Sequence, residues 1–151
     1  EGGADVLWVE TISAPEEYRA AADAALRADM PWCGTMSFDT AGRTMMGVKP
    51  EQAVKELAGL GVAALGANCG NGPDEMLGVL GKMAETGTTV PLVAKANAGM
   101  PRLVDGVAIY DATPDSMVRY ATEVRARGAR IIGACCGSTT AHLAAMGKAL
   151  A

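Results

Sequence analysis

Short apolar runs alternate with helix-forming stretches five times along this chain, with a period of roughly 30 residues. Each run has the length of a buried strand, and each stretch that follows starts near a proline or a capping residue. The runs expected to be strands are residues 5–10, 32–38, 62–68, 91–96 and 130–134. Continuous apolar strands separated by helices are typical of a parallel sheet covered by helices. The sequence therefore predicts an α/β fold, with residues 1–151 in one domain.

Proline, glycine and capping residues set the limits of the intervening helices. We expect helices at about residues 15–28, 50–59, 73–85, 114–127 and 139–151. Ser13 and Glu16 match a capping box for the first helix, and Thr113 is the expected cap of the fourth. Residues 97–112 are interrupted by glycine and proline and are predicted to form a long loop.

Charge and composition exclude several classes of protein. The formal net charge is −4 and lysine and arginine form no run, which argues against a nucleic-acid partner. No apolar stretch approaches the roughly 18 residues of a membrane span, and the residues after Glu1 lack the positively charged and apolar regions expected of a signal peptide. We therefore expect a cytoplasmic protein with no membrane partner. Because the chain opens on Glu1 and reaches a strand almost at once, we interpret it as part of something longer, although processing or truncation would explain the same start.

Three of the four cysteines fall where predicted strands end. Cys69 follows the third strand, and Cys135 and Cys136 follow the fifth. Zinc binds thiolates in tetrahedral geometry, and catalytic sites offer it three protein ligands and one open position. Adjacent cysteines in a regular strand point to opposite faces, so the pair can share a metal only where the chain bends, and Gly137 supplies that bend. With one strand between them the two segments lie less than about 10 Å apart.

Simple burial is the alternative to metal binding for the three strand-end thiols, since free cysteines are often found in protein cores. Cys33 lies within a strand and is expected in the core. His142, the only histidine, lies within a helix and is expected to have a surface or helix-packing role and not to bind a metal. Two disulfides would suit a small secreted scaffold better than this alternating pattern of strands and helices.

The cysteine motifs resemble those of a known family. The sequence Ile-Ile-Gly-Ala-Cys-Cys-Gly-Ser at residues 131–138 is similar to the Gly-Gly-Cys-Cys-Gly-Thr signature of homocysteine S-methyltransferases. Residues 66–70, Gly-Ala-Asn-Cys-Gly, look like the family's upstream Gly-x-Asn-Cys motif, and residues 3–11 look like its Gly-x-Asp-x-x-x-x-Glu-Thr strand. The departures are Ala134 for a glycine and Ser138 for a threonine, which leave the proposed ligands untouched.

The resemblance implies a fold and an activity. The family's fold is an eight-stranded (β/α) barrel of TIM type, and this chain looks like its last five units, with the N-terminal strands lacking. It implies zinc held by Cys69, Cys135 and Cys136, and methyl transfer to the thiol of homocysteine to form methionine. Residues 10–11 and 32–38 look most like the betaine–homocysteine type, so betaine or a related compound is the expected donor. The barrel would be completed by its missing half or by a homo-oligomer.

Further site residues are predicted from the resemblance and from their place at strand ends. Glu10 is implied as the carboxylate that binds the amino group of the substrate. Asn68 is predicted to bind substrate or to orient its neighbour Cys69, and a turn-stabilising role is the alternative. Thr35, Ser37, Asn97 and the aromatic Tyr110 are pocket candidates by location, with Ser37 included in the predicted substrate site.

Three alternatives stay open. The chain could be the homocysteine-activating module of a corrinoid-dependent methionine synthase, or could use S-methylmethionine as donor. It could also be a non-catalytic zinc-binding fragment of such a barrel. A cysteine-based hydrolase or redox protein is disfavoured, because the chain has no Cys-x-x-Cys pair and no histidine near a strand end.

Overall fold

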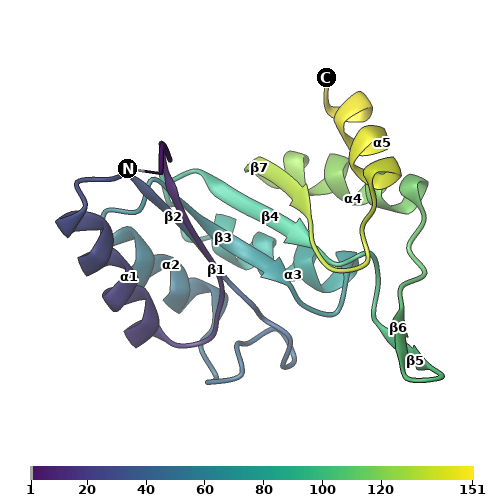
Figure 1. Ribbon diagram of the computed structural model, residues 1–151, viewed down its shortest axis with the longest axis horizontal. Helices are drawn as coiled ribbons and strands as arrows, with labels where there is room; N and C mark the ends of the chain where they lie inside the picture. Colours follow the sequence, from purple (N-terminus) through teal and green to yellow (C-terminus); the bar gives the residue numbers. More distant parts are fainter. Residues whose placement is uncertain (1) are drawn as a thin grey trace.

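Five parallel strands form one sheet in the computed structural model, which describes residues 2–151 (Figure 1). They lie side by side in the order β1-β2-β3-β4-β7, so each strand pairs with the next one of the sheet along the chain. Their bounds are β1 (Leu7–Ile12), β2 (Trp32–Met36), β3 (Ala64–Cys69), β4 (Leu92–Ala96) and β7 (Ala129–Ala134). The predicted strands are confirmed to within two residues at either end.

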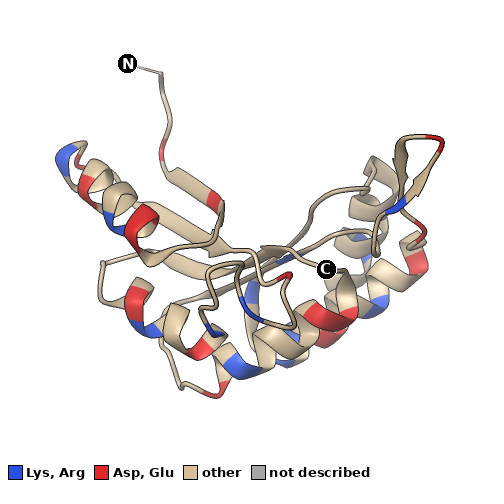
Figure 2. Cartoon of the chain, turned by 90° about the horizontal axis from the view of Figure 1, so that it is seen from below, with Lys and Arg blue, Asp and Glu red and all other residues tan. Residues whose placement is uncertain are grey.

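Four helices connect these strands, a fifth follows β7, and all five lie on one side of the sheet. Figure 2 shows the sheet curving, with the helices along its outer, convex side. The helices are α1 (Pro15–Arg27), α2 (Pro50–Ala58), α3 (Pro73–Ala84), α4 (Pro114–Ala126) and α5 (Thr140–Leu150), as the sequence predicted. None of the helices in residues 2–151 is both long enough and apolar enough to span a membrane.

Local hydrogen bonds explain where two of the helices begin. The Thr113 side chain accepts from the backbone N–H of Ser116 (3.2 Å), which confirms it as the cap of α4. For α1 the predicted Ser13–Glu16 box is wrong by one residue. Glu17 instead accepts from the backbone N–H groups of Ser13 and Ala14 at 3.2 and 3.3 Å. Because Ala14 takes the extended cap position, the third helical residue is Glu17.

The predicted loop between residues 97 and 112 contains a small antiparallel hairpin. Its strands, β5 (Arg102–Val104) and β6 (Val107–Ile109), have three residues each and were missed for that reason. Asp105 and Gly106 both have positive φ, at 50° and 80°, which is the backbone of a two-residue type I′ turn. The hairpin projects beyond the carboxyl end of the sheet (Figure 1).

The two faces of the sheet have different surroundings. Side chains alternate between faces along each strand. On the helix-covered face, Trp32, Leu65 and Ala94 lie in the main apolar core together with side chains from the helices. Close packing there requires Gly34 in β2, because a Cβ at this position would stand 2.4 Å from Cε1 of Tyr18 in α1.

The opposite face, here called the inner face, is not covered by any helix within residues 2–151. Its lower part is a small buried cluster of Cys33, Ala64 and Val93 with Ile131 packed against it, so the prediction that Cys33 packs in the core is confirmed. Trp8 is 38% exposed on this face, since no strand of the described chain lies beyond β1. The other strand residues on the inner face are Glu10, Thr35, Gly66, Asn68, Lys95 and Gly133.

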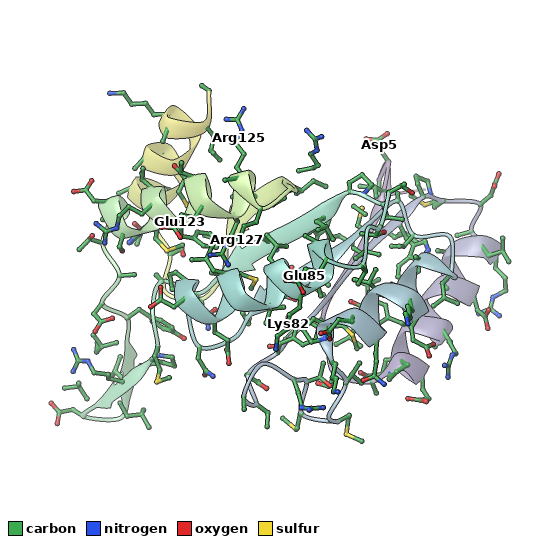
Figure 3. The ribbon with its side chains drawn as sticks, turned by 180° about the vertical axis from the view of Figure 1, so that it is seen from behind. Asp5, Lys82, Glu85, Glu123, Arg125 and Arg127 are labelled. Carbon is green, nitrogen blue, oxygen red and sulfur yellow. The ribbon has the colours of Figure 1, made fainter. Side chains whose placement is uncertain are left out.

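Charged residues gather on the helices and contribute to helix packing there. Figure 3 labels several of them on the outer side, including Lys82, Glu123 and Arg127. Arg127 follows α4, and its guanidinium donates to the carbonyl oxygen of Leu77 in α3 (2.8 Å). This bond joins two neighbouring helices beneath the sheet.

Candidate metal centre

Three thiols from two distant segments meet at the carboxyl end of the sheet. The Cys69 Sγ lies 2.9 Å from the Cys135 Sγ and 3.9 Å from the Cys136 Sγ. All three sulfur atoms lie within 4.8 Å of one another. β4 lies between the strands that deliver them, so the short reach predicted across one intervening strand is confirmed.

Cys69 ends β3 in an unusual backbone conformation. Its φ is 59°, in the left-handed region that non-glycine residues rarely adopt. Gly70 follows at φ 73°, so the chain turns sharply immediately after the thiol. The turn is fixed by Glu75 of α3, whose carboxylate accepts from the backbone N–H (2.8 Å) and side-chain amide (3.2 Å) of Asn71. Backbone strain of this kind concentrates at functional sites.

Cys135 and Cys136 lie where the chain leaves β7. The Cys135 N–H still donates to Ala96 in β4 (2.8 Å), while Cys136 is already in the turn. Gly137 has φ 79°, which confirms it as the bend that allows both thiols to face one point. Tyr110 packs directly on this glycine, since a Cβ at residue 137 would stand 2.1 Å from Cγ of the tyrosine.

Asn68 is completely buried beside the thiols, with its amide fully engaged. Its Oδ1 accepts from the backbone N–H of Thr11 (2.9 Å) and from the Thr35 hydroxyl (2.7 Å). Its Nδ2 donates to the Thr11 hydroxyl (2.7 Å) and to the Cys69 Sγ (3.5 Å). These bonds hold β1, β2 and β3 in register at the site, and they support the orienting role. A contact between Asn68 and substrate stays a prediction.

Asn97 connects the two cysteine segments. Its Nδ2 donates to the carbonyl oxygen of Gly70 (2.7 Å), and its Oδ1 accepts from the backbone N–H of Cys136 (3.0 Å). The side chain is 6% exposed. It therefore fixes the distance between the turn after β3 and the turn after β7.

The sulfur positions can be tested against the geometry of a tetrahedral metal site. With zinc–sulfur bonds of about 2.3 Å, two thiolates on one ion lie about 3.8 Å apart. The separation of Cys69 and Cys136 matches this value, and the Cys69 and Cys135 sulfurs need to separate by about 0.9 Å, a change within reach of side-chain rotation. Three thiol donors suit a soft or borderline metal such as zinc. The residues therefore fit a zinc ion.

The thiols influence one another's protonation. Burial, followed by hydrogen bonding with Cys135, raises the pKa of the Cys69 thiol to about 12. Burial acts in the same direction on Cys135, but hydrogen bonds from the Cys69 thiol and from the backbone of Cys136 outweigh it, and its pKa is lowered. Without a metal, Cys135 is thus the more readily ionised of these two thiols and Cys69 carries its proton.

The remaining predicted residues lie at or below the thiol cluster. Glu10 is on the inner face and forms an ion pair with Lys95 of β4. Ser37 directly follows β2, is 6% exposed, and donates its backbone N–H to Ile12 (3.1 Å).

His142 is not part of the thiol cluster. Its Nδ1 accepts from the backbone N–H of Thr139 (3.0 Å) and its Nε2 lies 2.9 Å from the carbonyl oxygen of Ala112, so the predicted packing role is confirmed.

Sequence reasoning missed two residues that shape the site. Lys95 was overlooked, although a lysine in an otherwise apolar strand was a visible signal. Glu75 was overlooked because an acidic residue in the first turn of a helix is common and has no functional implication by itself.

Comparisons with known proteins match nearly the whole length of the chain. The family model described as "Homocysteine S-methyltransferase" matches residues 1–150. The chain is 30% identical over 158 aligned residues to methionine synthase of Mycobacterium tuberculosis, and 30% identical to that of Mycobacterium leprae. Both alignments cover 100% of this chain but 13% of the relative, so the chain spans about an eighth of the curated relatives it matches.

Solved structures show the same relationship. The apo form of the homocysteine methyltransferase MmuM from Escherichia coli superposes with a TM-score of 0.78 at 27% identity, covering 97% of this chain and 50% of that one. Its metallated form superposes with a TM-score of 0.77 at 28% identity, covering 97% of this chain and 45% of that one. The five βα units are therefore part of a TIM-type barrel, as predicted.

Proposed function

This chain belongs to the homocysteine S-methyltransferase family, and from that membership we propose that it is part of an enzyme that methylates the thiol of homocysteine to give methionine. In this reaction a lone pair on the homocysteine sulfur forms a bond to the methyl carbon of a donor. The donor's bond to that carbon breaks, and the donor keeps its electron pair. The thiol proton is lost to solvent, because only the thiolate is an effective nucleophile.

The observation that carries the proposal is the convergence of three sulfurs from two strand ends separated by β4. We propose that Cys69, Cys135 and Cys136 hold zinc, in agreement with the fit of their spacing to a tetrahedral site. Bound zinc would supply one thing, a lowered pKa for the homocysteine thiol, whose ordinary pKa near 8.5 leaves only a small fraction ionised at neutral pH.

The chain's own residues position the components. Asn68 and Asn97 orient the cysteines through the hydrogen bonds described above, and such supporting bonds commonly affect metal affinity. Glu10 is proposed to accept the ammonium group of homocysteine, since it is a partly exposed carboxylate on the inner face. Ser37 is proposed to line the same pocket at the end of β2.

The donor is proposed to be betaine or a related methyl compound, as the resemblance at residues 10–11 and 32–38 implies. A second candidate is methyl transfer within a methionine synthase, where a corrinoid is the expected methyl carrier. The alignment of the complete chain with the mycobacterial methionine synthases favours this candidate.

We further propose that other barrel strands, from another segment or another copy, cover the inner face and the open edges of β1 and β7. Unpaired edges of a sheet otherwise invite association. Residues 1–151 are proposed to act as one domain within that assembly, in a reducing compartment such as the cytoplasm, because all four cysteines are free thiols. No nucleic-acid or membrane partner is proposed.

Turnover with a panel of donors tests the proposal. The complete protein, supplied with homocysteine, should form methionine from betaine, S-methylmethionine or a methylcorrinoid. Removal of metal by a chelator should abolish this activity, and zinc should restore it. Retention of zinc without turnover from any donor would support the non-catalytic alternative. Full activity after verified metal removal would contradict the zinc proposal.

A further inference from the structure

An ion pair crosses the inner face of the sheet beneath the thiol cluster. It joins Glu10 in β1 to Lys95 in β4, across the two strands β2 and β3. The side chains are 39% and 22% exposed respectively, so both groups are accessible from the inner face. Val93, two residues before Lys95 on the same face, is completely buried in the inner cluster, so the lysine lies beside apolar side chains and its charge needs a compensating partner.

Gly133 leaves room for the side chain of Lys95, and Trp8 lies close to its ammonium group. Lys95 pairs in register with Gly133 of β7, where a Cβ would stand 3.2 Å from Cγ of the lysine. The glycine thus leaves space for the lysine stem. The Lys95 Nζ also lies 5.5 Å from the centre of the Trp8 ring, within the range of a cation–π interaction.

The ion pair is connected to the thiols through the sheet. Lys95 pairs in register with Asn68, which donates to the Cys69 Sγ, and Asn68 also binds Thr11, the residue after Glu10. Cys135 directly follows β7 and lies two residues beyond Gly133, about 6.6 Å further along the chain if it stays extended. The sulfur and α-carbon of homocysteine are three bonds apart, roughly 4 Å when extended. A thiol bound at the cysteines therefore brings its amino-acid head group close to the ion pair.

We propose that Glu10 and Lys95 together recognise the zwitterionic head group of homocysteine, with Lys95 binding the α-carboxylate while Glu10 binds the α-ammonium. This inference rests on the proposed function and adds the carboxylate-binding residue. Insertion of the head group replaces one ion pair by two and leaves the net charge of the site unchanged. Both new contacts are charge-assisted hydrogen bonds, which are the stronger kind.

Two truncated substrates separate the roles of the two residues. 3-Aminopropanethiol lacks the carboxylate of homocysteine, and 4-mercaptobutyrate lacks the ammonium group. Binding of each thiol to the complete zinc-loaded protein is measured by titration calorimetry, with zinc content and circular dichroism as checks on folding. Lys82→Gln, which removes a lysine on the outer helix α3, serves as the control.

We expect Lys95→Gln to weaken homocysteine and 4-mercaptobutyrate about 10- to 100-fold and to leave 3-aminopropanethiol unchanged or tighter. Glu10→Gln should weaken homocysteine and 3-aminopropanethiol and spare 4-mercaptobutyrate. Lys95→Arg should retain most of the affinity for homocysteine. If Lys95→Gln does not fold, the wild-type protein still tests the inference, because it should bind 3-aminopropanethiol about 10- to 100-fold more weakly than homocysteine.

The inference is overturned if Lys95→Gln changes the affinity of all three thiols equally or of none. Equal wild-type affinity for homocysteine and 3-aminopropanethiol would overturn it as well, while leaving the proposed function intact. If the wild-type protein binds no homocysteine, the proposed function fails, and the inference fails with it.

Discussion

Asn97 accepts a hydrogen bond from the backbone N–H of Cys136 at 3.0 Å, and so anchors the segment that carries two of the three clustered thiols. The same side chain donates to Gly70, next to the third thiol (2.7 Å). One amide thus sets the spacing between both halves of the candidate metal centre. Its removal should affect metal binding more than a surface substitution of similar size.

Asn97→Ala should lower zinc affinity about 10- to 100-fold, as is common when a supporting contact of a metal ligand is lost. It should also lower the free energy of unfolding by about 1–3 kcal/mol, because two partly buried hydrogen bonds to the backbone are lost. Competition with a chromogenic chelator measures the affinity. Thr122→Ala is the control, since that hydroxyl makes one exposed bond within α4 (3.0 Å). Equal zinc affinity in the two variants would show that Asn97 does not hold the site.

The four cysteines allow a matched comparison of metal content. Cys69→Ser, Cys135→Ser and Cys136→Ser should each reduce the zinc bound per chain, since each removes one of the clustered sulfurs. Cys33→Ala should bind as much zinc as wild type, because Cys33 lies in the apolar cluster with Ala64 and Val93. Elemental analysis of purified protein makes the comparison. Zinc loss in Cys33→Ala at unchanged stability would contradict the assignment.

Gly137 is required for two separate reasons, positive φ and close packing on Tyr110. Gly137→Ala should cost more than the roughly 1–2 kcal/mol of a left-handed alanine, because its Cβ would meet Tyr110 at 2.1 Å. Gly87→Ala is the control, since Gly87 has φ 70° with no atom within 4 Å of the added Cβ. Denaturant unfolding measures the stability of both variants.

The double variant Tyr110→Gly/Gly137→Ala separates these two contributions. This double variant should regain the stability that Gly137→Ala loses through the clash with Tyr110. It should not regain the stability lost through the positive φ of residue 137. Equal losses of stability in Gly137→Ala and Gly87→Ala would show that the contact with Tyr110 carries no strain.

Zinc binding should release protons and weaken as pH falls. Because the pKa of Cys69 is raised to about 12, this thiol is protonated at neutral pH without metal and must lose its proton to bind. Each proton released makes the apparent affinity fall about tenfold per pH unit of acidification. Because the pKa of Cys135 is lowered, this thiol contributes less to the proton release. Titration with zinc in weakly buffered solution containing a pH indicator measures the proton release. A zinc affinity that does not change between about pH 6 and 8 would contradict this account.

Much of the fold and the metal centre could be predicted because the signals are local. Apolar runs bounded by glycine and proline marked all five parallel strands, and Cys69 and Cys135 could be placed because strand ends in a parallel sheet meet at one edge. Gly137 was predicted as a bend from its position alone and has the positive φ expected.

The rest depends on contacts between segments far apart in the sequence. Asn97 was predicted only as a pocket residue, since its two partners belong to different loops. Lys95 and Glu10 are separated by 85 positions, and their pairing requires the register of four strands. The hairpin from Arg102 to Ile109 was missed because three-residue strands show little periodicity, although Asp105-Gly106 was a usable turn signal.

X-ray absorption at the zinc edge tests the central claim most directly. The complete zinc-loaded protein should show three sulfur ligands at about 2.3 Å, and a fourth sulfur on addition of homocysteine. Cys33→Ala should give the same spectrum as wild type. Fewer than three sulfurs, a nitrogen ligand from His142, or a spectrum unchanged by saturating homocysteine would contradict the account of a three-cysteine zinc centre that binds the substrate thiol.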